Sequence, residues 1–246
     1  MKLVLLGTGG YHPSDLRHTA CLTLPELGVV FDAGTAFYRL RDHLQTDRID
    51  IFLTHAHLDH VIGLTFLFDV LWRHDDVKVY VHGDASVLAS VREHLFAEPL
   101  FPAQPPIVWV SLEGDLQLAD GARLSHIPLP HPGGSRGYRV DWPDRSLAYI
   151  TDTTAADEAC YVNFVRGVDL LVHECYFSDE HPERAALTGH SCTTPVARLA
   201  AAADVKRLVL VHVNPLTGAE DPIDLATARQ VFPATELGVD GMEVEF

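Results

Sequence analysis

Short apolar runs rich in β-branched residues recur along the chain, and each has the length of a β-strand. They occupy residues 3–6, 29–31, 49–53, 77–81, 107–110, 139–140, 147–150, 170–172 and 208–211. Several of these runs are apolar at nearly every position, which is typical of strands buried on both faces. The pattern therefore predicts sheet at the centre of the fold.

Helical patterns lie between many of these runs, at residues 36–44, 63–73, 85–96, 155–165, 195–203 and 224–231. Thr194 followed by Pro195 is typical of an N-cap with proline at the first helical position. Hairpin-like steps and strand–helix steps are mixed, which favours a layered α/β fold over a doubly wound one. The 246 residues fit a single domain over residues 1–246.

Composition excludes several classes of protein. The chain is 47% hydrophobic and has 18 Lys and Arg against 34 Asp and Glu, which gives a net charge of −16. This balance argues against DNA, against a broad nucleic-acid surface and against anionic membranes. The apolar start at residues 3–6 is shorter than a signal-peptide core. The cysteines are far apart and form no CxxC pair, so we expect a reducing, cytoplasmic location.

The chain has 15 histidines, and their densest group follows a predicted buried strand. The segment Thr54-His55-Ala56-His57-Leu58-Asp59-His60 places two histidines on one side of an extended backbone. If a helix starts next, Asp59 and His60 project toward the same region. Imidazole and carboxylate together suit zinc or a similar divalent ion. Four such side chains within six residues favour two adjacent ions over a loop that is merely rich in histidine.

This segment matches the HxHxDH motif of the metallo-β-lactamase superfamily, and the resemblance extends along the whole chain. Further segments resemble motifs of its tRNase Z-like branch: the opening Leu6-Gly7-Thr8-Gly9-Gly10 with His12-Pro13-Ser14, Phe31-Asp32-Ala33-Gly34, His131 with Gly137-Tyr138-Arg139, Thr151-Asp152-Thr153, His173-Glu174-Cys175-Tyr176-Phe177, Gly189-His190-Ser191 and Val211-His212-Val213. The resemblance implies a four-layer αββα sandwich of two mixed sheets flanked by helices.

Carried over onto this sequence, the resemblance implies a dinuclear metal site. One ion would be held by His55, His57 and His131, and the other by Asp59, His60 and His212, with Asp152 bridging the two. The ions would be Zn²⁺, or alternatively Mn²⁺. A bridging carboxylate fits the spacing of about 3.5–4 Å that two-metal phosphoryl chemistry uses.

Three residues have implied catalytic roles. Glu174 would orient His190, and His190 would stabilise or protonate the leaving side of a phosphodiester. The alternative is a buried Glu–His pair that only supports the fold. Asp59 could also orient or deprotonate the attacking water. Asp32 is interpreted as a turn carboxylate that accepts backbone N–H groups.

The implied reaction is phosphodiester hydrolysis by a metal-bridged hydroxide. Only 21 residues separate His131 from Asp152, so the arm with which tRNase Z enzymes grip tRNA does not fit there. Asn214 and Pro215 stand where that family usually has an Arg-Tyr pair. We therefore favour a small or cyclic nucleotide-like phosphodiester, with a tRNA 3′-processing endoribonuclease as the alternative on RNA. A thioester or lactone hydrolase is the alternative of another class, and the branch suggests a homodimer.

Overall fold

The computed structural model describes residues 1–74, 76–218 and 221–246. The chain folds into two compact units. Unit 1 comprises Met1–Glu113 and Val239–Glu245, and unit 2 comprises Gly114–Gly238 and Phe246. Within the described residues, none of the helices is both long and apolar enough to cross a membrane. The single domain over residues 1–246 stays a prediction.

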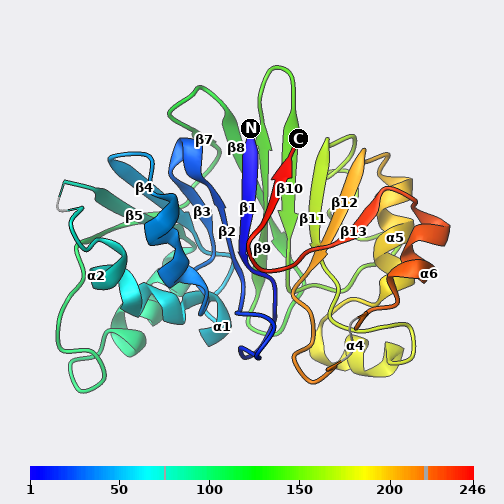
Figure 1. The fold of residues 1–246 in the computed structure, drawn as a ribbon, viewed down its shortest axis with the longest axis horizontal. Helices are drawn as coiled ribbons and strands as arrows, with labels where there is room; N and C mark the ends of the chain where they lie inside the picture. The colour runs from blue at the N-terminus through cyan, green and yellow to red at the C-terminus, as the bar shows by residue number, and fades with distance from the viewer. Residues whose placement is uncertain (75, 219–220) are drawn as a thin grey trace. The chain divides into compact units, whose positions relative to one another are not determined.

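Unit 1 contains a seven-stranded mixed sheet in the order β14-β1-β2-β3-β4-β5-β6 (Figure 1). Its strands are β1 (Lys2–Gly7), β2 (Cys21–Leu24), β3 (Val29–Phe31), β4 (Arg48–Phe52), β5 (Lys78–Gly83), β6 (Ile107–Ser111) and β14 (Met242–Glu245). β14 pairs antiparallel with β1, so the two ends of this unit's chain lie side by side in one sheet.

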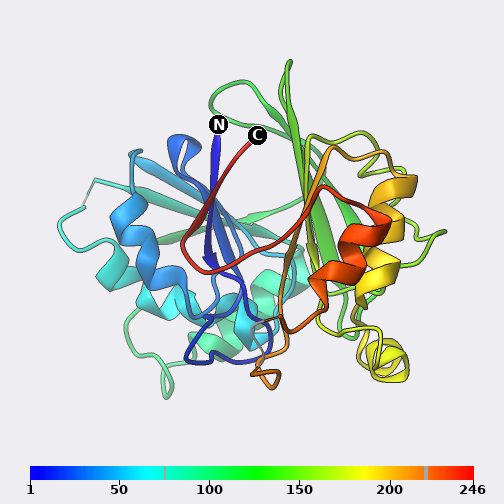
Figure 2. The same ribbon diagram turned by 45° about the vertical axis from the view of Figure 1, so that its right-hand side comes forward.

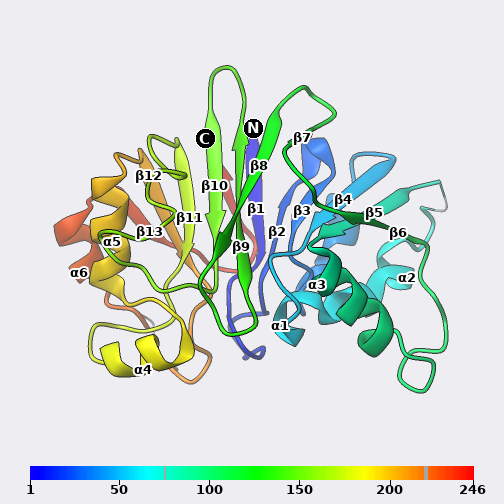
Figure 3. The same ribbon diagram turned by 180° about the vertical axis from the view of Figure 1, so that it is seen from behind.

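Seven short helical segments accompany this sheet. They are η1 (Pro25–Leu27), η2 (Phe37–His43), α1 (Leu58–Val61), η3 (Ile62–Phe66), α2 (Leu67–Val70), α3 (Ala85–Ser90) and η4 (Val91–Leu95). Ile49 and Ile51 of β4 share a buried cluster with Phe37 of η2 and Leu67 of α2. Each such side chain contributes about 1.5–3 kcal/mol on burial. Figure 3 shows α3 beside β5 and β6.

Unit 2 contains the second seven-stranded mixed sheet, in the order β13-β12-β11-β10-β9-β8-β7. Its elements are β7 (Leu116–Gln117), β8 (Arg123–Leu129), β9 (Ser135–Asp141), β10 (Ser146–Ile150), β11 (Leu170–Glu174), α4 (Pro182–Thr188), α5 (Thr193–Ala202), β12 (Arg207–Val211), α6 (Leu225–Val231) and β13 (Thr235–Leu237). Leu208 and Leu210 of β12 share a core cluster with Leu199 of α5 and Ala228 of α6. α5 and α6 lie side by side next to this sheet (Figure 2).

The two sheets follow one pairing pattern. In each, three antiparallel pairs are followed by three parallel pairs. In unit 1 the strands from β14 to β3 pair antiparallel and those from β3 to β6 pair parallel. In unit 2 the strands from β7 to β10 pair antiparallel and those from β10 to β13 pair parallel. Parallel strands end at the same edge of their sheet. β3 and β4 therefore bring the segments after Phe31 and Phe52 together, and β10, β11 and β12 do the same in unit 2.

Three helix predictions are wrong in detail. Residues 155–165 were expected to be helical but form successive turns. Tertiary contacts outweigh helix propensity there, because the Ala155 N–H donates to Ser191 Oγ (2.9 Å) and the Tyr161 hydroxyl contacts His173 Nε2 (2.8 Å). The helix expected at 195–203 begins at Thr193, so Cys192 and not Thr194 is its N-cap.

The helix expected at 63–73 is replaced by α1, η3 and α2, which together run from residue 58 to 70. Gly63 explains part of this, since a Cβ there would lie 2.2 Å from the carbonyl oxygen of Gly34. The close approach fixes the segment against the loop after β3. The sequence pattern also missed β2, β7, β8, β13, β14 and α4.

Candidate metal centre

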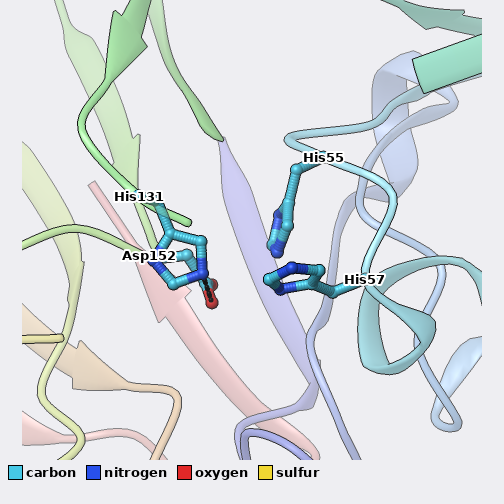
Figure 4. Close-up of side chains that lie close together, drawn as sticks. All are labelled: His55, His57, His131 and Asp152. Atoms are coloured by element: carbon cyan, nitrogen blue, oxygen red, sulfur yellow. Dashed lines mark ion pairs between the residues drawn. The ribbon is translucent and has the colours of Figure 1, made fainter. Parts of the chain in front are cut away.

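The loop after β4 gathers four predicted ligands within unit 1. His55 and His57 lie on an extended stretch, with ring centroids 4.3 Å apart, and the His60 ring lies 4.3 Å from that of His55. Figure 4 shows His55 and His57 projecting from this loop. Asp59 Oδ2 lies 3.4 Å from His60 Nε2, because both residues stand on α1. The predicted HxHxDH cluster is therefore formed locally.

Asp32, which is fully buried after β3, organises this cluster. Its Oδ1 accepts the backbone N–H of Thr54 (2.8 Å), and its Oδ2 accepts Nδ1–H of His60 (2.9 Å). The Thr54 hydroxyl lies 3.0 Å from both Asp32 oxygens and 3.0 Å from His55 Nδ1. A carboxylate only accepts, so His60 must donate from Nδ1, and the Thr54 hydroxyl that donates to Asp32 must accept from His55.

Both histidines are thereby held in the tautomer whose Nε2 carries a lone pair. This is the arrangement in which a second hydrogen bond orients a histidine metal ligand. The interpretation of Asp32 as a turn carboxylate is correct for the Thr54 N–H. Its contact with His60 also makes it a support for a proposed ligand.

Three further predicted ligands meet within unit 2. Asp152 follows β10, His212 follows β12, and His131 lies in the turn between β8 and β9. Nε2 of His131 lies 3.5 Å from Asp152 Oδ1, and Nε2 of His212 lies 3.4 Å from Asp152 Oδ2. Figure 4 shows His131 beside Asp152. One carboxylate thus presents a different oxygen to each histidine, which is the geometry that a bridging role needs.

Gly189 holds His131 in place. Nδ1–H of His131 donates to the carbonyl oxygen of Gly189 (3.0 Å), which again leaves Nε2 as the acceptor. Gly189 has φ +74°, and a Cβ there would lie 2.6 Å from Pro132 Cδ and 3.0 Å from His131 Nδ1. The glycine of the predicted Gly189-His190-Ser191 motif is therefore required by its contact with His131.

Backbone strain marks the same residues. Among the described residues, seven other than glycine have positive φ, and they include Asp32 (59°), Asp152 (51°) and His212 (57°). Such conformations cost about 1–3 kcal/mol each and gather at functional sites. The side chains of Asp32, Asp152 and His212, which follow β3, β10 and β12, are thus held in place at that energetic cost.

Glu174 and His190 form a buried hydrogen-bonded pair in unit 2. Glu174 Oε1 accepts Nδ1–H of His190 (3.0 Å) and the Thr153 N–H (2.8 Å), and its Oε2 accepts the Ser191 N–H (3.2 Å). Glu174 is completely buried and the His190 side chain is 13% exposed. The carboxylate is therefore fixed by two backbone groups, and its remaining bond orients the imidazole.

His190 stands among the unit 2 ligands. Ligand atoms of Asp152, His190 and His212 lie within 4.8 Å of one another. The His190 ring stacks on Tyr176, with centroids 4.5 Å apart and planes 15° apart. Tyr176 belongs to the predicted Glu174-Cys175-Tyr176 motif, but its stacking role was missed. It confines His190 to a single ring plane beside the cluster.

His173 supports the strand end that carries Glu174. Nδ1–H of His173 donates to the Glu174 carbonyl oxygen (2.7 Å), so its Nε2 accepts from the Tyr161 hydroxyl (2.8 Å). Burial lowers the pKa of His173 and raises that of Tyr161 well above its usual value. Both groups therefore stay neutral, and these contacts give His173 a structural role.

The donor set fits divalent zinc or manganese. Imidazole Nε2 atoms and carboxylate oxygens dominate each cluster, and hydrogen bonds orient His55, His60 and His131 from behind. The four cysteines are free thiols, three of them buried, and they belong to neither cluster.

Comparisons with known proteins agree with this chemistry. The sequence matches the beta-lactamase superfamily domain over residues 28–213. It is 29% identical to the ribonuclease Z of Metallosphaera sedula, over 95% of this chain and 94% of that one. The structure is similar to the metallo-β-lactamase fold protein YhfI from Bacillus subtilis, with a TM-score of 0.82 at 18% identity, covering 100% of this chain and 99% of that one.

A second similar structure is that of a diphosphatase from the PhnP family, with a TM-score of 0.76 at 22% identity. It covers 100% of this chain and 97% of that one. Together with the two mixed sheets, these likenesses confirm the predicted fold class.

Proposed function

The chain belongs to the metallo-β-lactamase superfamily, as a metal-dependent hydrolase similar to ribonuclease Z, and we propose that it cleaves a small phosphodiester. The observation that carries this proposal is the Glu174–His190 pair beside Asp152 and His212. Thioesters and lactones contain no phosphate, so their hydrolysis does not need an acid placed at the leaving oxygen of a phosphodiester. A carboxylate-oriented imidazole at this place favours phosphoryl chemistry over that alternative.

In this proposal, seven side chains hold two divalent ions. His55, His57 and His131 hold the first, Asp59, His60 and His212 hold the second, and Asp152 bridges them. The orientation of the Nε2 atoms in unit 1 and the two-sided contacts of Asp152 in unit 2 support this assignment. Two such ions would lower the pKa of a water molecule and neutralise charge on the phosphate.

The protein side chains would divide the remaining work. His190, whose Nδ1–H is committed to Glu174, directs Nε2 toward the reacting group and can donate a proton from it to the leaving oxygen. Glu174 stabilises the charged imidazole that this step requires. Asp59 would orient the attacking water.

The proposed substrate is small. β9 and β10 form a hairpin that fills most of the interval between His131 and Asp152, so no arm extends from this interval. The alignment with the Metallosphaera ribonuclease Z spans 280 positions, which exceeds the 246 residues of this chain. That relative therefore carries insertions that this chain lacks. The similarity to a diphosphatase is consistent with a small substrate.

The densest basic stretch offers no phosphate-binding face. Arg139 pairs with Asp141 and donates to the Phe164 carbonyl, and Arg145 pairs with Asp144. Arg136 contacts His126. These arginines are therefore engaged by groups of the same unit. RNA processing stays the alternative, because the curated relative is a ribonuclease Z.

A turnover panel tests the proposal. Metal-loaded protein is assayed with bis(p-nitrophenyl) phosphate, 2′,3′- and 3′,5′-cyclic nucleotides, a sugar cyclic phosphate, a pre-tRNA, a thioester and a lactone. We expect hydrolysis of small diesters, with His57→Ala and Asp152→Ala inactive and the exposed His94→Ala unchanged. Turnover of thioesters or lactones with every phosphodiester inert would refute it, and efficient cleavage of pre-tRNA alone would favour the alternative.

Two companion measurements address metal and assembly. Metal analysis after gentle purification should give close to two divalent ions per chain. The homodimer and the cytoplasmic location stay predictions, and light scattering of the purified protein tests the first.

A further inference from the structure

The loop over residues 8–18 is anchored at both ends by one carboxylate of unit 1. Oδ1 of Asp240 accepts the backbone N–H (3.0 Å) and the hydroxyl (2.8 Å) of Thr8. Oδ2 accepts the His18 N–H (2.7 Å) and pairs with the Arg39 guanidinium (2.7 Å). The Gly9 N–H also donates to the His18 carbonyl (2.8 Å). This loop is therefore a fixed structure.

Tyr11 lies within this loop and is tied to the proposed metal site. Its backbone N–H donates to Asp59 Oδ2 (2.7 Å). It also has φ +61°, and so joins Asp32, Asp152 and His212 among the strained residues. Its strained backbone places it directly against a proposed ligand.

The Tyr11 side chain points to solvent. The residue is 71% exposed, and its ring packs edge-on against the His12 ring, with centroids 5.3 Å apart. His12 Nδ1 in turn contacts the Pro13 carbonyl (2.8 Å). An aromatic ring that is exposed, held from one side and attached to an anchored backbone is suited to stack on a planar group. Such stacking binds nucleobases without requiring a particular base.

We propose that Tyr11 is a specificity-determining residue that stacks on a nucleobase of the substrate while its own N–H fixes Asp59. This inference rests on the proposed phosphodiesterase function and narrows it to nucleotide diesters. Base stacking within the range known for aromatic side chains corresponds to about a tenfold effect on binding.

Three variants separate the ring from the backbone. Tyr11→Gly removes the ring but keeps the N–H and accepts φ +61° without strain, so the loop is retained. Tyr11→Phe keeps the ring. Leu16→Ala is the matched control, because Leu16 is 70% exposed on the same loop.

Two cyclic diesters test the role of the ring. 2′,3′-cyclic AMP carries a base, and glycerol 1,2-cyclic phosphate has the same five-membered phosphodiester without one. We expect Tyr11→Gly to raise KM for the nucleotide about tenfold more than for the glycerol ester. Tyr11→Phe and Leu16→Ala should behave as the parent protein. An equal change with both esters, or no change with either, would overturn the inference.

A binding measurement keeps this test separate from the proposed function. Isothermal titration calorimetry compares adenosine 5′-monophosphate with ribose 5-phosphate on metal-loaded protein. Tighter binding of the nucleotide that is lost in Tyr11→Gly supports the stacking role even if no diester is hydrolysed, in which case only the proposed reaction fails. Equal binding of both ligands by the parent protein refutes the role of Tyr11.

Discussion

Replacing Asp32 by Asn tests whether hydrogen bonds to the far ring nitrogen orient the proposed histidine ligands for metal binding. Asn is nearly the same size, and it tolerates the φ of +59° that Asp32 adopts. Its single carbonyl oxygen can still accept the Thr54 N–H. The NH₂ group would then face His60 Nδ1, where Asp32 Oδ2 now accepts at 2.9 Å.

The NH₂ group of the asparagine and Nδ1–H of His60 would then both be donors, so they could not form a hydrogen bond with each other. His60 can relieve the conflict by moving its proton to Nε2, but Nε2 then has no lone pair with which to bind a metal. Loss of such an orienting group typically costs about 10–100-fold in metal affinity, or about 1.4–2.8 kcal/mol. We expect Asp32→Asn to weaken metal binding within this range.

Competition with a chromophoric zinc chelator measures the affinity, and urea unfolding in excess chelator separately measures the stability of the metal-free protein. Asp50→Asn is the control, because Asp50 also accepts from a buried histidine, His82 Nε2 at 2.7 Å, but belongs to no ligand cluster. Asp50→Asn should lose stability and keep metal affinity. Equal metal affinity in Asp32→Asn, Asp50→Asn and the parent would refute the reasoning.

Three further outcomes are expected. His190→Ala should lower kcat by about 10²–10⁴-fold with metal content unchanged, and loss of metal would instead make His190 a ligand. Asp50→Asn should cost about 1–3 kcal/mol equally at pH 7 and pH 5. Although burial opposes ionisation, hydrogen bonds from His82 and Arg48 hold the pKa of Asp50 below 3.8. The contribution of Asp50 to stability is therefore complete above that pH and declines only below it. A stability difference between variant and parent that vanishes by pH 5 would contradict this. Activity should fall at acidic pH together with bound metal, measured in the same samples, because the imidazoles of the proposed ligands must be neutral to bind. Activity lost while the metal is retained would point to another titrating group.

The strands were predictable where apolar runs coincide with buried sheet. The expected run at residues 49–53 corresponds to β4 (Arg48–Phe52), and the run at 147–150 to β10. Short strands such as β2 and β14 were missed, because pairing with β1 and not local composition makes them extended. The turns at residues 155–165 show the opposite failure, since alanine-rich composition there yields to contacts with distant residues.

The proposed ligands can be selected from residue type and spacing, but the hydrogen bonds that orient them cannot. His55, His57, Asp59 and His60 are close in sequence, so one loop brings them together. The bond from His60 to Asp32 spans 28 residues, and that from His131 to Gly189 spans 58. Such contacts exist only once β3, β4 and the turns of unit 2 are in place.

The net charge of −16 constrains the substrate through where the positive charges lie. Many basic side chains are engaged with carboxylates of their own unit, as in Arg39–Asp240, Arg48–Asp50 and Arg207–Glu236. A polynucleotide gains affinity by releasing counterions along a continuous basic track, and paired arginines contribute little to that. A small diester needs only one cationic point at its reacting phosphate. The proposed ligand set would provide such a point, because its two carboxylates cannot neutralise two divalent ions. The net charge of −16 and the lack of an arm between His131 and Asp152 therefore favour the same substrate class, the first for an electrostatic reason and the second for a steric one.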